Sequence, residues 1–208
     1  MGSVFDRNGH QANQRAKIIV GLERLSTLFR AALWEEAKQY NLSPLQVQIL
    51  LFIAFHDTKQ CSVTAIAREF AVTKATISDA VKVLLEKDLL KKNTGDDARG
   101  FLLTLSAAGS KYTGKLSGIS DFFQASLDKV PQVEINKIWE GMLLLIGHLQ
   151  ETEIIPMRMC NNCRHFGKEH PGGNPHFCNL MQKPLAVENI RLDCPEHAVS
   201  KVATNDLP

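Results

Sequence analysis

Four cysteines close to the C-terminus constrain this chain more than any other feature. Four of its five cysteines lie after residue 159, with the spacing C-x2-C-x14-C-x15-C; they are Cys160, Cys163, Cys178 and Cys194. The surrounding segment, 157–197, is rich in Cys, His, Asn, Gly and Pro and poor in aliphatic residues. About 40 residues with so small a core rarely fold without a covalent or metal link. Since clustered cysteines in a reducing compartment bind metals more often than they form disulfides, 157–197 is predicted to be a metal-binding module.

The identity of the metal centre is less constrained. Structural zinc ribbons usually carry two C-x2-C pairs, whereas this segment has one pair and two single cysteines. Pro195 follows the last cysteine, as in some ferredoxins. The stretch from Cys160 to Phe166 also resembles the opening of the high-potential iron–sulfur proteins. These features favour an iron–sulfur cluster, [4Fe–4S] or [2Fe–2S], with zinc and a thiol–disulfide switch as alternatives.

The module histidines and Cys61 are not expected to be metal ligands. Any of four histidines in the module could replace a cysteine, but they are expected to lie around the site or at the surface: His165, His170, His176 and His197. Cys61 lies far from the module at the start of a predicted helix. A helix N-terminus can activate a thiol, yet a small buried side chain is the favoured interpretation of Cys61.

Composition places the chain among globular proteins. Of its 208 residues, 44% are hydrophobic and 22% charged, which excludes disordered and fibrous classes. The net charge is +2, so any nucleic-acid binding must depend on a local basic surface. The polar segment 1–14 does not resemble a secretory signal, and no apolar run approaches the ~20 residues of a membrane span. A soluble cytoplasmic protein is expected.

The first two thirds of the chain carry the pattern of a winged helix. Apolar residues at three- and four-residue steps predict helices over 15–40 and 44–56, the second capped by Ser43 with Pro44 at its first position. Two further helices, begun by Ser62 and Thr73, are joined by a three-residue turn, which is typical of a helix-turn-helix. Two short strands, 89–92 and 101–105, follow as a hairpin.

Long helices flank this unit. One is predicted to begin at Ser106 and to continue past Leu116, Ile119, Phe123 and Leu127, weakened locally by glycines, and another to run from 135 to 150 after Pro131. Because the end helices have no other domain to cover them, a dimer interface is favoured over intramolecular packing. The expected organisation is a flexible 1–14, a mainly α (α+β) winged-helix and dimerisation domain over 15–150, a linker over 151–156, the cysteine module over 157–197 and a tail over 198–208.

The second helix of the helix-turn-helix carries the side chains that would meet DNA. Its exposed residues are predicted to be short hydrogen-bond donors and cations suited to bases and phosphates: Thr73, Lys74, Thr76, Ser78 and Lys82. Arg99 at the hairpin tip is suited to a minor groove. Residues 59–115 hold ten Lys/Arg against six Asp/Glu, although Asp79 in the same helix would repel phosphate. A winged helix that binds proteins is the alternative.

The run 42–116 resembles the MarR family of bacterial transcriptional regulators. The resemblance is carried by Leu42-Ser43-Pro44-Leu45-Gln46, Ala65-Ile66-Ala67-Arg68, Thr76-Ile77-Ser78, Leu84 with Glu86-Lys87-Asp88-Leu89-Leu90, Asp97-Ala98-Arg99, and Leu103-Thr104-Leu105-Ser106 with Ala108-Gly109. It implies a homodimer on a pseudo-palindromic operator in double-stranded DNA, with Arg99 as the wing contact supported by Asp97. Ala98 departs from the family pattern, in which a second arginine is common.

Together these features predict a DNA-binding regulator whose iron–sulfur cluster senses redox state, nitric oxide or iron and modulates operator binding. No phosphate-binding loop, G-x-S-x-G or H-E-x-x-H motif is present, so an enzyme is not expected. The alternatives are the same regulator with a structural zinc site and a small-molecule effector, or a redox or electron-transfer protein that uses a winged helix as scaffold.

Overall fold

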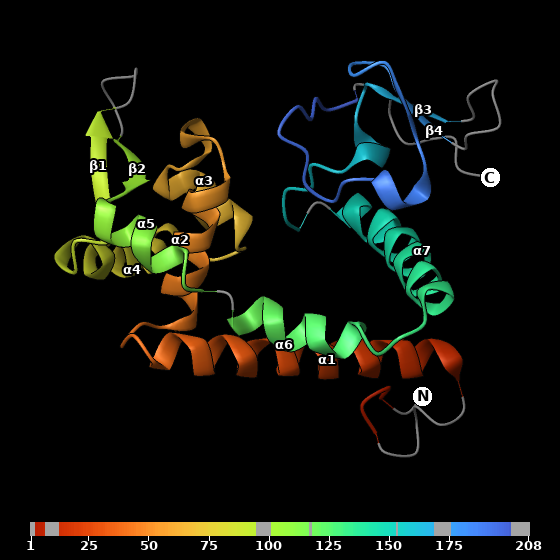
Figure 1. Cartoon of the computed structure of the whole chain (residues 1–208), viewed down its shortest axis with the longest axis horizontal. Coiled ribbons are helices and arrows are strands. Elements are labelled where there is room, and N and C mark those ends of the chain that lie inside the picture. The colour runs from red at the N-terminus through yellow and green to blue at the C-terminus, as the bar shows by residue number, and fades with distance from the viewer. Residues whose placement is uncertain are drawn as a thin grey trace. The chain divides into compact units, whose positions relative to one another are not determined.

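The computed structural model divides the chain into two compact units (Figure 1). Unit 1 comprises 1–55 and 79–126, and unit 2 comprises 56–78 and 127–208. The structure describes residues 3–6, 13–94, 101–116, 118–152, 154–168 and 176–200. No helix among these residues has the length and apolar character needed to span a membrane.

Unit 1 is built of helices and one hairpin. Its elements are α1 (Gln14–Lys38), α2 (Pro44–Phe55), most of α4 (Lys74–Glu86), β1 (Leu90–Thr94), β2 (Phe101–Leu105), α5 (Ala107–Thr113) and α6 (Gly118–Leu127). The strands pair antiparallel, with Leu90 opposite Leu105 and Thr94 opposite Phe101. Helix α2 packs against α1, β2 and α5. The predicted helices over 15–40 and 44–56 and the predicted hairpin are therefore confirmed.

The core of unit 1 lies around α2. The aliphatic side chains of this helix and of its neighbours are buried; they include Leu33, Val47, Ile49, Leu50, Ile53, Leu84, Leu90 and Leu103. Burial of several such side chains, each at roughly 1.5–3 kcal/mol, holds the hairpin and the surrounding helices together. Tyr40 and Tyr112 meet edge to face, with ring centroids 4.4 Å apart, and join α5 to the segment after α1.

Short hydroxyl side chains begin four helices. The Ser43 Oγ accepts a hydrogen bond from the Gln46 N–H at 3.3 Å, and the Gln46 Oε1 accepts one from the Ser43 N–H at 2.8 Å. This reciprocal pair is a capping box. Similar single caps are made by Ser62, Thr73 and Ser106. The predicted helix starts at Ser43, Ser62, Thr73 and Ser106 are confirmed.

The predicted single helix from Ser106 through Leu127 is wrong. The structure ends α5 at Thr113 and begins α6 at Gly118. Gly114 caps the end of α5, and Gly118 is the first residue of α6. Glycine costs roughly 1 kcal/mol relative to alanine inside a helix, and the two glycines at the break explain why the helix does not continue. In Figure 1 α6 runs along α1, where Phe29 stacks on Phe123 at 5.6 Å.

Unit 2 combines the first helix of the helix-turn-helix with the C-terminal segment. Its elements are η2 (Thr58–Gln60), α3 (Val63–Glu69), the first turn of α4, α7 (Gln132–Leu149), η3 (Gln150–Thr152), η4 (Cys160–Asn162), β3 (Phe166–Lys168), β4 (His176–Cys178), β5 (Lys183–Leu185) and η5 (Val187–Asn189). The three strands form an antiparallel sheet in the order β3-β4-β5. The predicted final helix over 135–150 is confirmed, with an earlier start at Gln132.

Helix α7 packs against the cysteine module. The Trp139 Nε1–H donates to the Val187 carbonyl at 2.9 Å, and a Cβ at Gly147 would touch the Asn161 side chain at 3.0 Å. The sequence pattern instead groups this helix with the winged helix. The structure therefore ties the cysteine module to α7 along much of the length of that helix.

Apolar side chains remain exposed along α1. In the single chain the exposed apolar side chains of this helix include Ile18, Ile19, Leu22, Leu25, Leu28 and Phe29. Leu33 and Ala37, near the C-terminal end of α1, are buried. We call the exposed set the α1 stripe; so large an apolar patch is typical of an interface.

Candidate functional site

A tight turn connects α3 to α4. Ala71 has a positive φ of 50°, and the Val72 N–H donates to the Ala67 carbonyl at 3.0 Å. This left-handed residue ends α3 in the way that helix C-termini commonly end, here with alanine in place of glycine. Thr73 then begins α4, since its Oγ1 accepts from the Thr76 N–H at 3.1 Å. The predicted helix-turn-helix is present.

The side chains predicted to meet DNA lie on the exposed face of α4. Five of them are exposed: Thr73, Lys74, Thr76, Ser78 and Lys82. Ile77 and Val81 of the same helix are buried, at 0% and 2% exposure, and so lie away from this face. Asp79 is exposed on the same helix. Thr73 and Thr76 hydrogen bond to each other through their hydroxyls at 2.8 Å, which orders the start of this face.

The structure describes the wing only near the strands β1 and β2, up to Thr94 and from Phe101. Lys92 lies over the Phe101 ring, with Nζ 4.4 Å from the ring centroid, and Asn93 donates to the Thr104 hydroxyl at 2.8 Å. Lys91 and Lys92, which are not among the predicted DNA contacts, are both exposed and add positive charge. The predicted wing residues Arg99 and Asp97 lie outside the described residues.

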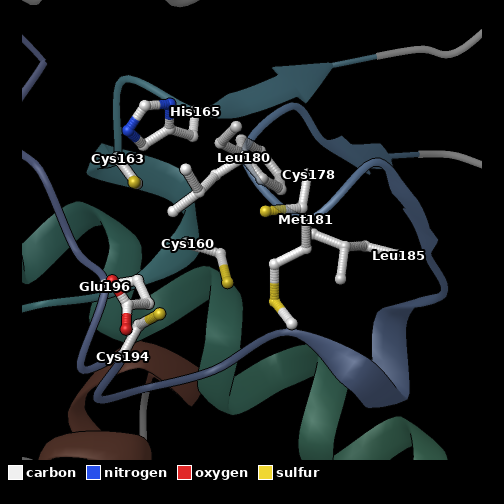
Figure 2. Close-up of a pocket in the computed structure, with 10 residues that line it drawn as sticks. Cys160, Cys163, His165, Cys178, Leu180, Met181, Leu185, Cys194 and Glu196 are labelled. Atoms are coloured by element: carbon white, nitrogen blue, oxygen red, sulfur yellow. The ribbon is translucent and has the colours of Figure 1, made fainter.

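All four late cysteines line one cavity in unit 2 (Figure 2). Figure 2 shows their sulfur atoms around a common hollow, which is completed by apolar side chains. The other lining residues are Phe166, Leu180, Met181, Leu185, His165 and Glu196. Residues that are separated by up to 34 positions in the sequence are thus brought to one place, and none of the five cysteines forms a disulfide.

Each cysteine is positioned by local backbone structure. Cys160 begins η4 and Cys163 follows it, joined by a hydrogen bond from the Cys163 N–H to the Cys160 carbonyl at 3.0 Å. Cys178 is the last residue of β4. Cys194 is held next to the first pair, because its N–H donates to the Arg158 carbonyl at 2.9 Å. In return, the Cys160 N–H donates to the Arg191 carbonyl at 3.1 Å.

The cavity disfavours an uncompensated thiolate at Cys160. Burial raises the pKa of this thiol, and the neighbouring Cys194, Cys178 and Cys163 groups act in the same direction. The Arg191 N–H, 3.3 Å from the Cys160 Sγ, acts in the opposite direction, and the Arg191 guanidinium lies 4.0 Å from the Cys194 Sγ. Mutually repelling thiolates in a partly buried hollow are the donor set that a bound cation or cationic cluster core would stabilise.

Among the described residues, no group of three or more His, Cys, Asp or Glu side chains converges closely enough to hold one metal ion. Tetrahedral Zn–S bonds of about 2.3 Å would bring the sulfurs to about 3.8 Å from one another. The four cysteines line one hollow without forming such a tetrahedral set.

The module histidines have distinct surroundings. His165 lines the cavity together with the cysteines. His176 packs on Phe166 at 4.8 Å between ring centroids, and burial lowers its pKa. The His197 Nε2 bonds to the Asn162 Oδ1 at 2.8 Å. His170 lies outside the described residues.

Sequence reasoning missed a polar network beside the cavity. It consists of Arg158, Asp193, Glu69 and His56, and we call it the Arg158 network. Its members come from both chain segments of unit 2, 56–78 and 127–208, and no sequence motif connects them. The one available signal was position, since Arg158 lies two residues before Cys160 and Asp193 lies immediately before Cys194.

Comparisons with known proteins place the fold. Residues 40–100 match the model of the MarR family. The structure of a Methanosarcina mazei MarR transcriptional regulator is similar, with TM-score 0.57, 13% identity, and coverage of 65% of this chain and 97% of that one. Staphylococcus aureus MarR, in complex with salicylate and kanamycin, has TM-score 0.58 and 19% identity, covering 65% and 91%.

A third similar structure is the S. aureus MepR–DNA complex, with TM-score 0.54, 17% identity, and coverage of 61% of this chain and 94% of that one. No curated protein matches the chain. At 13–19% identity these three matches show a shared fold, and each leaves more than a third of the chain without a counterpart. Residues 40–100 therefore match the MarR family model, and the chain shares the winged helix-turn-helix fold of these similar structures.

Proposed function

We propose that this protein is a transcriptional regulator that binds double-stranded DNA through α4. The observation that carries the proposal is the exposed polar face of α4 on a winged helix matched by the MarR family model. In a helix-turn-helix the second helix enters the major groove and its N-terminal residues reach base edges. S. aureus MepR has been captured as a DNA complex, which supports the same use of this fold here.

We infer that the regulator acts as a homodimer on a pseudo-palindromic operator. The α1 stripe exposes a run of large apolar side chains, among them Leu25 at 58% and Leu28 at 51%. A second copy of the same stripe would cover it through a self-complementary interface. Two recognition helices would then meet half-sites separated by one helical turn of DNA, or a multiple of it.

We further propose that the cysteine cavity holds an iron–sulfur cluster, [4Fe–4S] or [2Fe–2S], that senses redox state, nitric oxide or iron. Its ligands would be Cys160, Cys163, Cys178 and Cys194, which line one hollow. The Arg191 N–H and guanidinium lie beside two of the sulfurs and would stabilise their negative charge. The cluster would supply the staple that the small core lacks, so that its loss would alter the segment that carries it.

A titration of DNA binding tests the first proposal. A preferred site selected from a random duplex library is labelled and titrated with wild type, Lys82→Ala and the control Lys129→Ala, whose exposed lysine lies outside α4. Because Lys82 is predicted to contact phosphate, its loss should weaken binding and reduce the salt slope by about 1. The control should bind as wild type. Absence of binding to any duplex at low salt would favour a redox protein that uses the winged helix as scaffold.

Metal and sulfide analysis tests the cluster. Protein purified without oxygen is expected to be coloured and to contain iron and acid-labile sulfide in equal amounts. Cys178→Ser should lose both, while Cys61→Ala, altered outside the cavity, should keep both. A colourless protein with one zinc ion per chain and no sulfide would overturn the cluster.

A regulator with structural zinc and a small-molecule effector is the second candidate. An apolar hollow lies between α1 and α6, lined by Leu28, Ala31, Ala32, Glu35, Glu36, Gln39 and Phe122. S. aureus MarR was solved in complex with salicylate. Release of the operator by salicylate, together with zinc in the module, would favour this candidate.

A further inference from the structure

We propose that the Arg158 network couples the cysteine module to the helix-turn-helix, so that the condition of the module sets the position of α3 and of the turn into α4. The proposal deepens and rests on the proposed function, because it names the residues through which cluster occupancy would reach the DNA-binding helix. Arg158 acts here as a positioning residue.

Arg158 joins two carboxylates. Its Nε donates to the Asp193 Oδ1 at 2.6 Å and its Nη2 to the Asp193 Oδ2 at 3.0 Å. Toward the other side, Nη1 donates to the Glu69 Oε2 at 3.0 Å and Nη2 to the Glu69 Oε1 at 3.1 Å. Both contacts are bidentate, a geometry that constrains direction as well as distance.

The network is partly shielded from solvent. The side chains of Arg158 and Glu69 are 18% and 19% exposed, and that of Asp193 is 44% exposed. The His56 Nε2 lies 2.8 Å from the Asp193 Oδ2. At this burial the pairs are screened less than surface ion pairs, and removal of one partner leaves the others poorly solvated.

One end of the network lies on the ligand segments. Arg158 precedes Cys160 by two residues, and Asp193 immediately precedes Cys194. The two residues form a parallel β-bridge, and the main chains exchange hydrogen bonds from Cys194 to Arg158 and from Cys160 to Arg191. Movement of Cys160 or Cys194 would therefore move the guanidinium and its carboxylate partner together.

The other end of the network lies on the helix-turn-helix. Glu69 is the last residue of α3, and the turn that leads into α4 begins with the next residue. Four positions separate Glu69 from Thr73, and the main chain between them is held by the hydrogen bond from Val72 to Ala67. A displacement of Glu69 is thus passed through a short, ordered turn to the exposed start of α4.

The experiment compares operator affinity with and without the cluster. Full-length wild type, Glu69→Gln and Glu69→Asp are each measured by fluorescence anisotropy, cluster-loaded and after anaerobic chelation. The matched control is Glu86→Gln, which changes an exposed carboxylate at the end of the next helix. Iron and sulfide per chain and hydrogen exchange of 63–73 are recorded for every sample. Coupling between sites is typically 5- to 150-fold in affinity.

For wild type, operator affinity is expected to differ at least fivefold between the cluster-loaded and chelated forms. Glu86→Gln should show the same difference. Glu69→Gln should bind the cluster fully and differ less than twofold, with hydrogen exchange of 63–73 unchanged by cluster loss, and Glu69→Asp should restore part of the ratio. If Glu69→Gln keeps the wild-type ratio of loaded to chelated operator affinity, coupling through the Arg158 network is overturned and cluster sensing is left intact. If wild type binds the operator equally well in both forms, or if the chain holds no cluster, both the coupling and the cluster-sensing proposals are overturned.

Discussion

At the residue scale, the close approach of the main chain of Leu89, and not helix propensity, explains why position 109 is a glycine. A Cβ at this position would collide with the Leu89 carbonyl, and the neighbouring Ser106 hydroxyl donates to the Asp88 carbonyl. Together they hold the start of α5 against the residues that precede β1. The sequence pattern identifies Gly109 as a weak point of a helix; its actual role depends on a neighbour 20 positions away and could not be read locally.

Gly109→Ala should therefore destabilise the protein. Forcing a methyl group against a main-chain carbonyl typically costs 1–3 kcal/mol, and urea unfolding would measure the change. The control is Gly141→Ala, because a Cβ at Gly141 in α7 meets open space. That substitution should be neutral or stabilise by about 0.5–1 kcal/mol. Equal effects of the two substitutions would contradict the steric explanation.

Cys61 should behave as an unreactive thiol. Its side chain is fully buried, and burial together with Asp57 raises its pKa to about 11. The folded state therefore holds the proton more tightly than the unfolded state, so this group favours folding up to about pH 9 and loses that contribution as the pH rises through 11.

A variant with serine at the four module cysteines isolates this thiol. At pH 8 a disulfide reagent should leave native Cys61 unmodified and modify one thiol per chain in denaturant. Modification of the native thiol within seconds would instead indicate an activated cysteine.

At the element scale, local signals were sufficient where neighbours in the sequence decide the structure. The caps at Ser43, Ser62 and Thr73 were predictable because each side chain bonds to an N–H three residues later. The break between α5 and α6 was not predicted, since the apolar repeat continues across it. The buried Leu116 shows that this residue belongs to the core rather than to a continuous helix face.

At this scale the α1 stripe leads to a prediction about dimerisation. Leu25→Asp places a charge among exposed apolar side chains, which a single chain would tolerate but a dimer interface would not. The dissociation constant of the dimer should rise at least tenfold, as measured by light scattering across a dilution series. Arg24→Ala, which alters a neighbouring side chain that is 77% exposed, should leave the dimer intact. A dimer unaffected by Leu25→Asp would place the interface elsewhere.

At the scale of the whole molecule, spacing predicted the cysteine set but not its surroundings. The C-x2-C pair and two single cysteines suggested a shared site, and the structure places all four around one cavity. The packing of α7 against η5 and the pairing of Arg158 with Glu69 were not predictable, because the second contact joins residues 89 positions apart. Such contacts depend on the assembled fold, and no local pattern encodes them.

Removal of the proposed cluster should unfold the module before the winged helix. The module has three short strands and few buried apolar side chains, Met159 among them, whereas unit 1 has a continuous core around α2. Since binding free energy is folding free energy in so small a module, anaerobic chelation should raise proteolysis within 157–200 at least tenfold. Mass spectrometry would locate the first cuts, with Cys61→Ala as the control that retains the group. Equal resistance of loaded and chelated protein would mean that α7 and the Arg158 network hold the module without it.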